Sequence, residues 1–277
     1  MRRVVITGMG GLCSLGTSAD AIWASMKAGK QGIGPITTVD VSETKVMAGA
    51  EIVELPDIGL DHRRLVTMDR MAHLAVLASD EAWKQSGLPA SESGHRRIGA
   101  IVGVGTFGGI SIDDAYRAVW RENKRFPPIF TVPKAMPGAA AGQVSMHLGL
   151  KGPVFGVSSA CSSSNHAIGQ AMDLLRSGKA DVMIAGGADA PLSFGVLKAW
   201  ETLRVIAPEP CRPFSADRAG LSIGEGTGIF VLETEEHAKA RGATIIAELA
   251  GCGMTGDASD IVAPGVEGPA NAMAECL

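Results

Sequence analysis

Short apolar runs alternate with segments of helical periodicity along most of the chain. Runs rich in valine and isoleucine that end at glycine or polar residues are typical of buried strands. Apolar residues that recur every three or four positions fill the gaps between the first four runs and predict amphipathic helices. We expect strands at residues 4–7, 98–104, 154–157, 182–185, 228–232 and 245–249. We expect helices at residues 19–28, 68–85, 135–148, 162–176 and 235–241.

The alternation of strands and helices places the chain in the α/β class. Strands joined by helices favour a parallel sheet with helices packed on it, and the last two strands are expected to close the same layered unit. Residues 113–137 interrupt the pattern and predict a loop-rich excursion. Two interpretations of the excursion remain open: a lid or subunit contact, or a solvated surface insertion.

One cysteine lies where the third predicted strand turns into a helix. The turn is made of small residues, Ser158-Ser-Ala-Cys161-Ser-Ser-Ser, and the helical pattern after it stops at Gly178. A helix N-terminus carries partial positive charge and free N–H groups, so it favours a thiolate. The small neighbours leave room for a thioester to approach the sulfur. Cys161 is therefore a candidate nucleophile, and an inert apolar role is the alternative.

Composition and charge narrow the classes of function. The chain has 277 residues, 46% hydrophobic content and a net charge of −4, without the basic stripe of a nucleic-acid binder. Five scattered cysteines lack the spacing of a zinc site and fit a reducing compartment. No export signal or membrane-spanning run is evident, so we expect a cytoplasmic protein without nucleic-acid partners or metal.

Five short motifs follow one another along the chain, at residues 4–11, 152–163, 180–189, 212–218 and 224–228. They resemble, in this order, the motifs of the β-ketoacyl-acyl-carrier-protein synthases, above all the elongating type II enzymes. A single glycine cluster would be a weak signal, but five motifs in the family's order around the cysteine turn are a strong one. Other segments, including residues 130–144 and 190–217, are similar to a specialised branch that makes the acyl chains of nodulation signal lipids.

The resemblance implies a thiolase-like fold, in which two similar α/β halves pack as layers and a homodimer forms along an edge strand. Residues 1–253 would be the N-terminal half, about βαβαβαββ, and residues 254–277 the start of the second half, where a helix begins near Pro269. Members of the family continue past this length, and their active-site histidines, lysine and second oxyanion donor lie there. We therefore expect an incomplete chain with little condensing activity of its own.

The chemistry that the resemblance implies proceeds in two steps and needs no cofactor. Cys161 would accept the growing acyl group from an acyl-carrier thioester. Malonyl-carrier protein would then lose carbon dioxide, and the resulting carbanion would attack the acyl-cysteine in a decarboxylative Claisen condensation. Acyl carrier protein is thus the expected partner. No histidine of this chain matches a catalytic position of the family, and a helix-packing role is expected for His166.

The resemblance also suggests residues for binding. Phe107, in a glycine-rich run that carries one residue more than is usual, falls where relatives line the acyl channel; a packed aromatic side chain is the alternative. Phe194 and Trp200 are further candidate channel walls, although both could be core. Arg63 and Arg64, with Arg70 nearby, could meet the acidic carrier protein, or could be a solvated helix face. Glu225 is taken as structural.

Two other functions remain open besides the elongating synthase. A biosynthetic thiolase shares the fold but acts on coenzyme A esters, and the motifs around Cys161 and Gly224 favour the synthase. A non-catalytic dimer or carrier-binding partner would replace the nucleophile, whereas Cys161 is retained. The resemblance to the nodulation branch also leaves peripheral association with the inner membrane open.

Overall fold

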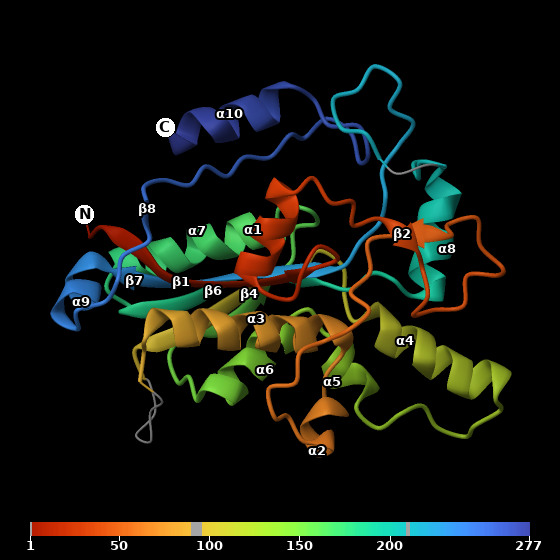
Figure 1. The fold of residues 1–277 in the computed structure, drawn as a ribbon, viewed down its shortest axis with the longest axis horizontal. Helices are drawn as coiled ribbons and strands as arrows, with labels where there is room; N and C mark the ends of the chain where they lie inside the picture. The colour runs from red at the N-terminus through yellow and green to blue at the C-terminus, as the bar shows by residue number, and fades with distance from the viewer. Residues whose placement is uncertain (1, 90–95, 209–210) are drawn as a thin grey trace.

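Helices cover both faces of a six-stranded sheet in the computed structural model, which describes residues 2–89, 96–208 and 211–277 (Figure 1). The strand order is β5-β4-β6-β7-β1-β8, and β2 and β3 form a separate two-stranded sheet. The strands are β1 (Val4–Cys13), β2 (Gly34–Pro35), β3 (Ala48–Gly49), β4 (Ile98–Gly103), β5 (Val154–Val157), β6 (Val182–Asp189), β7 (Gly226–Thr234) and β8 (Ala247–Leu249).

The helices separate into two layers on either side of the sheet. Figure 1 shows α3 and α6 beneath the sheet and α7 above it, with α10 lying over α7 on the outside. The helical elements are α1 (Ala19–Lys27), α2 (His62–Leu65), α3 (Arg70–Ser86), α4 (Gly109–Tyr116), a π-helical turn η1 (Arg117–Arg121), α5 (Thr131–Ala135), α6 (Ala139–Leu148), α7 (Ser163–Arg176), α8 (Phe194–Leu203), α9 (Glu235–Ala240) and α10 (Glu267–Cys276).

Each layer buries its own hydrophobic cluster against the sheet. On one face, Leu74 and Ala78 of α3 pack with Ile184 and Val231 of the central strands. On the other face, α7 packs Ala171 and Leu175 against Met183 and Leu232. Successive residues of a strand point to opposite faces, so one strand such as β6 supplies both clusters. The sheet core is therefore buried on both sides, as the unbroken apolar runs predicted.

Local signals fix the ends of the longest helix. Asp69 precedes α3 in an extended conformation, and its side chain accepts a hydrogen bond from the backbone N–H of Met71. Gly87 ends the helix with φ of +68°, the left-handed conformation that glycine adopts without steric cost. The predicted span of 68–85 is thus confirmed to within two residues, and the predicted helix at 162–176 is confirmed to within one.

The sheet is mixed rather than parallel, which corrects the prediction. β4 runs parallel to β5 and β6, but β7 runs antiparallel to both β6 and β1. The last residue of β6, Asp189, lies opposite the first residue of β7, Gly226. The chain therefore turns back through α8 at the end where β6 stops, whereas a parallel neighbour needs a crossover to the opposite end. Such a return is invisible in the hydrophobic pattern.

Two helical regions differ from the sequence-based expectation. Residues 113–137 are not purely loop, because they include the end of α4, the turn η1 and α5. The helix α8 follows β6 after a short connection and was missed altogether. Only Leu197 of this helix is buried, but its apolar side chains gather on one side as they do in α3, so a periodic signal was present in the sequence and was overlooked.

The last described segment begins with an extended stretch and ends in α10. This helix starts at Glu267, two residues before the position expected. A domain boundary after residue 253 stays a prediction. Within the described parts of the chain, no helix combines the length and the apolar character needed to cross a bilayer.

A buried carboxylate joins β7, β1 and α9. Glu233 is fully buried, and its oxygens accept hydrogen bonds from Thr7 and from both Nε and Nη2 of Arg241. His237 Nδ1 lies 2.6 Å from the same carboxylate. Burial acts to raise the pKa of Glu233, but the hydrogen bonds from Arg241, Thr7 and His237 outweigh it, so the pKa lies below its usual value.

This carboxylate makes the protein less stable in acid. Because the folded state depresses the pKa of Glu233, the stabilisation is complete above the pKa of about 4.3 for an unfolded glutamate and is lost as the pH falls through the lower folded value. Glu233→Gln should lose about 3 kcal/mol at pH 7, because Arg241 is left without its counter-charge. Its stability should then fall less steeply than that of the wild type below pH 5. Urea unfolding between pH 7 and pH 3 measures both effects.

The double variant Glu233→Gln with Arg241→Met is the matched control, since it removes both charges together. Its stability at pH 7 should exceed that of the single variant. If the stabilities of the wild type and of Glu233→Gln fell in parallel below pH 5, the pKa of Glu233 would be the same in the folded and unfolded states, which would contradict the prediction.

Candidate active site

A sharp turn between β5 and α7 exposes Cys161. The residue before the cysteine, Ala160, has φ of +51°, and the residues on either side of it, Ser159 and Cys161, form an isolated β-bridge. Left-handed geometry costs a residue with a β-carbon about 1 kcal/mol, so the surrounding contacts must hold the turn. We call residues 158–162 the elbow. The thiol of Cys161 is free and exposed at its tip, directly before the first turn of α7.

Serine side chains of the elbow and of α7 hold this geometry. Ser163 Oγ accepts a hydrogen bond from Ser159 N at 2.8 Å and donates one to the carbonyl of Ala160 at 2.6 Å. Ser162 Oγ donates to the carbonyl of Ser159 at 2.8 Å. The N–H and carbonyl groups of Ser159 and the carbonyl group of Ala160 are therefore satisfied by the two serines at the start of α7.

Glycines at the ends of β4 and β6 let the start of α7 approach the sheet. Gly103 and Gly187 pair across these parallel strands. A β-carbon on Gly103 would lie 2.3 Å from the carbonyl carbon of Ser163, and one on Gly187 would lie 2.6 Å from Cβ of Ser164. Neither distance is compatible with a side chain. The first turn of α7, and with it the position of Cys161, depends on these two bare backbone sites.

An aspartate at the end of β6 holds the loop next to the elbow, and the sequence analysis missed it. Asp189 accepts hydrogen bonds from Gly105 N at 2.6 Å and from the hydroxyl of Thr106 at 2.5 Å. Gly105 in turn lies against the elbow, since a β-carbon there would be 2.9 Å from the carbonyl oxygen of Ala160. The signal was present as a lone acid that ends a buried strand, and such a residue is usually functional or holds a loop.

The three predicted channel residues lie in different surroundings. Phe107 follows the loop held by Asp189 and is 41% exposed. Phe194 begins α8, with the guanidinium of Arg121 5.9 Å from the centre of its ring. Trp200 packs against a third hydrophobic cluster that includes Leu192 and Ile223. A role in substrate binding stays a prediction for all three.

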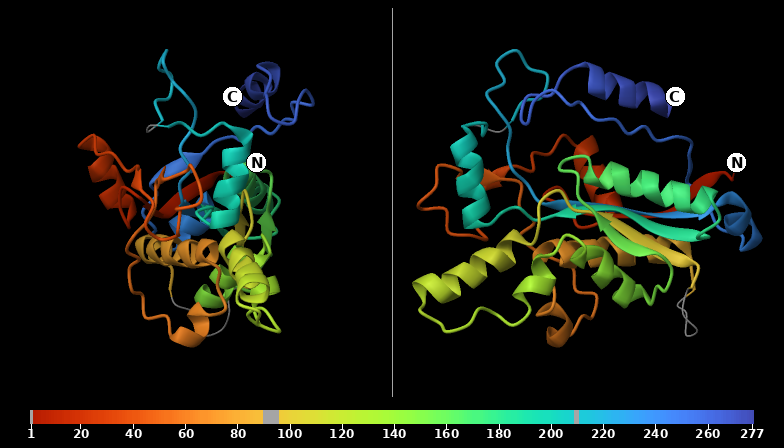
Figure 2. Two further views of the ribbon diagram at one scale, coloured as in Figure 1. Left: turned by 90° about the vertical axis from the view of Figure 1, so that its right-hand side faces the viewer. Right: turned by 180° about the vertical axis from the view of Figure 1, so that it is seen from behind.

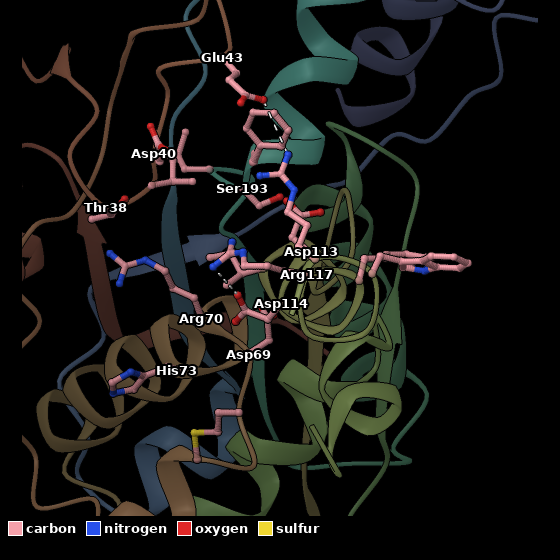
Figure 3. Close-up of a pocket in the computed structure, with 18 of the residues that line it drawn as sticks. Thr38, Asp40, Glu43, Asp69, Arg70, His73, Asp113, Asp114, Arg117 and Ser193 are labelled. Atoms are coloured by element: carbon pink, nitrogen blue, oxygen red, sulfur yellow. Dashed lines mark ion pairs between the residues drawn. The ribbon is translucent and has the colours of Figure 1, made fainter. Parts of the chain in front are cut away.

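A cavity of about 1000 Å³ lies beside Phe194, between α3, α4 and the segment around Asp40 (Figure 3). Its apolar lining includes Leu65, Met68, Ile110 and Leu192. Cys161 and Phe107 are not among its lining residues, so the cavity starts beyond the elbow rather than at it.

Two of the arginines that line this cavity form ion pairs with acids of its wall. Arg121 forms an ion pair with Glu43 at 3.7 Å, and Arg117 forms one with Asp114 at 3.5 Å. Figure 3 shows Arg117 and Asp114 on the wall of the cavity. Burial, and then the neighbouring Arg70, lower the pKa of His73, which favours the neutral imidazole. The cavity wall therefore combines ion pairs with an apolar floor.

The two arginines predicted to bind the carrier protein lie in different surroundings from Arg70. Arg63 is exposed and Arg64 is half-buried in the short helix α2, whereas Arg70 forms a 2.6 Å ion pair with Glu225. Glu225 is 5% exposed and also accepts a hydrogen bond from Ile52 N at 2.7 Å. The pair ties α3 to the chain before β7. Binding of a carrier protein at Arg63 and Arg64 stays a prediction.

The histidines are distributed over several elements. His166 lies on α7 near the elbow, with its Nδ1 atom 2.7 Å from Ser159 Oγ. His147 and His237 lie beside the acids Asp80 and Glu233. His62 is exposed on α2, and His95 falls outside the described residues.

Comparison with known proteins shows to which family the chain belongs. The family model for the N-terminal domain of β-ketoacyl synthases matches residues 1–238. The chain belongs to the β-ketoacyl synthase family. It is 58% identical to nodulation protein E of Rhizobium sp. (strain N33), over 100% of this chain and 69% of that protein.

Further members of the synthase family agree with this assignment. The chain is 37% identical to 3-oxoacyl-[acyl-carrier-protein] synthase 2 of Staphylococcus aureus (strain COL), over 96% of this chain and 66% of that protein. The crystal structure of a β-ketoacyl synthase from Burkholderia phymatum STM815 superposes with a TM-score of 0.90 at 34% identity, over 100% of this chain and 70% of that one. The thiolase-like layered fold expected from the sequence is thereby confirmed.

A substitution at Gly103 tests whether the start of α7 depends on its close approach to the sheet. Gly103→Ala should destabilise the protein by at least about 2 kcal/mol, because the added methyl group displaces the start of α7. The rate at which iodoacetamide alkylates Cys161 should also change, because Cys161 lies just before α7. Urea unfolding and peptide mass spectrometry measure the two effects.

Gly142→Ala is the matched control, since a β-carbon at this position in α6 meets no other atom within 4 Å. It should stabilise the protein by up to about 1 kcal/mol, because alanine favours the helix. If Gly103→Ala behaves like this control, α7 does not depend on the close approach.

Proposed function

We propose that this protein is an elongating β-ketoacyl-acyl-carrier-protein synthase in which Cys161 accepts the acyl chain. One observation carries the proposal: an exposed thiol on a strained elbow, at the N-terminus of a long buried helix. The first N–H groups of a helix have no partner within it, so they can stabilise negative charge on sulfur and on a thioester oxygen. Membership of the synthase family gives that thiol its reaction class.

The proposed reaction has two bond exchanges. The Cys161 thiolate attacks the carbonyl carbon of an acyl-carrier thioester; a new carbon–sulfur bond forms and the carrier thiol leaves. A malonyl-carrier thioester then loses carbon dioxide, and its carbanion attacks the acyl-cysteine and releases the thiolate. The described chain provides for the first exchange. The groups that would stabilise the carbanion match no histidine of this sequence.

We propose that the acyl chain extends from Cys161 past Phe107 toward the cavity beside Phe194. The loop that carries Phe107 touches the elbow through Gly105, and a β-carbon on Gly109 would contact both Phe107 and Ser193. Ser193 and Phe194 line the cavity, whose apolar floor suits a hydrocarbon chain. Trp200 would support α8 from the core behind it.

Acyl carrier protein is the proposed donor of both thioesters. The synthase from S. aureus carries that partner in its name. Carrier proteins are acidic, and Arg63 is an exposed cation on α2, next to Arg64. Because Arg70 is occupied by Glu225, these two arginines are the proposed contact.

A homodimer along the sheet edge is proposed as well. Among the described strands, β5 is hydrogen-bonded to β4 and leaves its other edge open. Phe155 on this strand is 41% exposed. An open edge of this kind can pair with a second copy, and sedimentation of the protein at a monomer mass would contradict this pairing.

The acyl product is proposed to be a specialised chain for a nodulation signal lipid. The identity of 58% to nodulation protein E, against 37% to the S. aureus enzyme, favours this role over general fatty acid synthesis.

Intact-protein mass spectrometry tests the nucleophile. The protein is incubated with a long-chain acyl-carrier thioester, and we expect one acyl mass on the wild type and none on Cys161→Ala, because the thiol is the acceptor. The same acyl group on coenzyme A should label more slowly, and Arg63→Glu should reduce labelling from the carrier protein alone.

Labelling that survives in Cys161→Ala would refute the assigned nucleophile. Faster labelling from coenzyme A than from the carrier protein would favour a thiolase. A folded wild-type protein that takes up no acyl group would favour a non-catalytic partner.

Phe107 should control the length of the accepted chain. Phe107→Ala opens the path beyond the elbow, so we expect the ratio of long-chain to short-chain acylation rates to rise about three- to tenfold, the effect of a few methylene groups in an apolar site. Single-turnover acylation with two chain lengths measures this ratio. Phe126→Ala removes an exposed phenyl ring that does not line the cavity, and an equal change in that variant would contradict the assignment.

A further inference from the structure

The side chain of Ser159 connects the elbow to the second turn of α7. Ser159 precedes Cys161 by two residues, and its Oγ lies 2.7 Å from His166 Nδ1. The histidine is half-buried on the helix, and its own backbone N–H donates to the carbonyl of Ser162 at 3.0 Å. This distance is that of a hydrogen bond, so the elbow is joined to α7 at His166.

The N–H, carbonyl and hydroxyl groups of Ser159 each form a hydrogen bond with a residue of α7 or with the residue before this helix. Its N–H donates to Ser163 Oγ, its carbonyl accepts from Ser162 Oγ, and its hydroxyl meets His166. Ser162 and Ser163 lie at the start of the helix, where the first backbone N–H groups have no partner within the helix. His166 lies one turn further on, next to the fully buried Ala167. It therefore links Ser159 to the rigid part of α7.

We propose that His166 is a positioning residue that fixes the orientation of the Cys161 thiol through Ser159. The strained conformation of Ala160 is retained only while its flanking residues are held, and Ser159 is one of the two. Without the imidazole, the elbow can relax and the thiol is held less firmly in its exposed position before the first turn of α7. This inference rests on the proposed function of Cys161 as the acyl acceptor.

The contact through Nδ1 allows a sharp choice of variants. The side-chain amide of asparagine reaches about as far as Nδ1 of histidine, whereas that of glutamine reaches about as far as Nε2. His166→Asn should therefore keep the hydrogen bond to Ser159, and His166→Gln should lose it, although both variants carry the same polar group. Ser159→Ala removes the hydroxyl, and Ser159→Thr retains it.

The measurement is the second-order rate constant for alkylation by iodoacetamide, read by peptide mass spectrometry at Cys161 and, as an internal reference, at Cys13. We expect His166→Gln and Ser159→Ala to slow alkylation of Cys161 about three- to tenfold, the equivalent of one hydrogen bond. His166→Asn and Ser159→Thr should stay within about twofold of the wild type. Alkylation of Cys13 should not change in any variant.

A double variant, Ser159→Ala with His166→Gln, tests whether the two residues act together. If they do, it should be no slower than the slower single variant. Equal rates in His166→Asn and His166→Gln would overturn the inference, as would a parallel change at Cys13. If His166→Gln does not fold, the comparison of Ser159→Ala with Ser159→Thr decides the question.

Alkylation needs neither carrier protein nor acyl group, so it separates this inference from the proposed function. A wild-type protein that is never acylated but shows the expected alkylation pattern would refute the function and retain the positioning role. If the wild type is acylated and Cys161 is alkylated at the same rate in all variants, the proposed function stands and the positioning role of His166 is refuted. Where acylation occurs, His166→Gln should lower its rate constant and leave the half-saturating concentration of carrier thioester unchanged.

Discussion

The close approach of α7 to the ends of β4 and β6 is the constraint on which the site depends. At Gly103 and Gly187 the helix start lies so near the sheet that no side chain fits between them. The approach leaves the connection from β5 only a few residues in which to reverse direction, and Ala160 adopts a left-handed conformation in that turn. The cost of about 1 kcal/mol is small beside the burial of the apolar face of α7. Packing of the helix thus stabilises the strained elbow and the exposed thiol on it.

The same approach decides which residues surround Cys161, the proposed nucleophile. Three parallel strands end together at the elbow, so the loops after β4 and β6 meet there. Asp189, at the end of β6, holds the loop after β4 and thereby places Phe107. The return of the chain through α8 then brings Phe194 to the neighbouring cavity. Residues that are far apart in the sequence are grouped by sheet topology rather than by any local motif.

The elbow was within reach of sequence analysis because its signals are local. A valine-rich strand, a run of small residues and a periodic helix lie within about 25 positions, and both predicted elements occur where expected. The direction of β7, the contact of Asp189 with the loop after β4 and the proposed role of Ser159 were out of reach, because each depends on contacts between segments that leave no periodic trace. The helix α8 was within reach but was overlooked, since its apolar residues gather on one side.

Charge pairing limits where an acidic partner can bind. Most cations near the site are already engaged: Arg70 with Glu225, Arg117 with Asp114, and Arg121 with Glu43. The pair of Arg70 and Glu225 is partly buried, so it resists screening, whereas the other two are exposed and contribute little to stability. Attraction over distance comes from charges that no neighbour neutralises, and exposed Arg63 on α2 meets that condition better than Arg70 does. An acidic carrier that binds at Arg63, as proposed, would therefore meet a charge outside the internal ion pairs of the cavity.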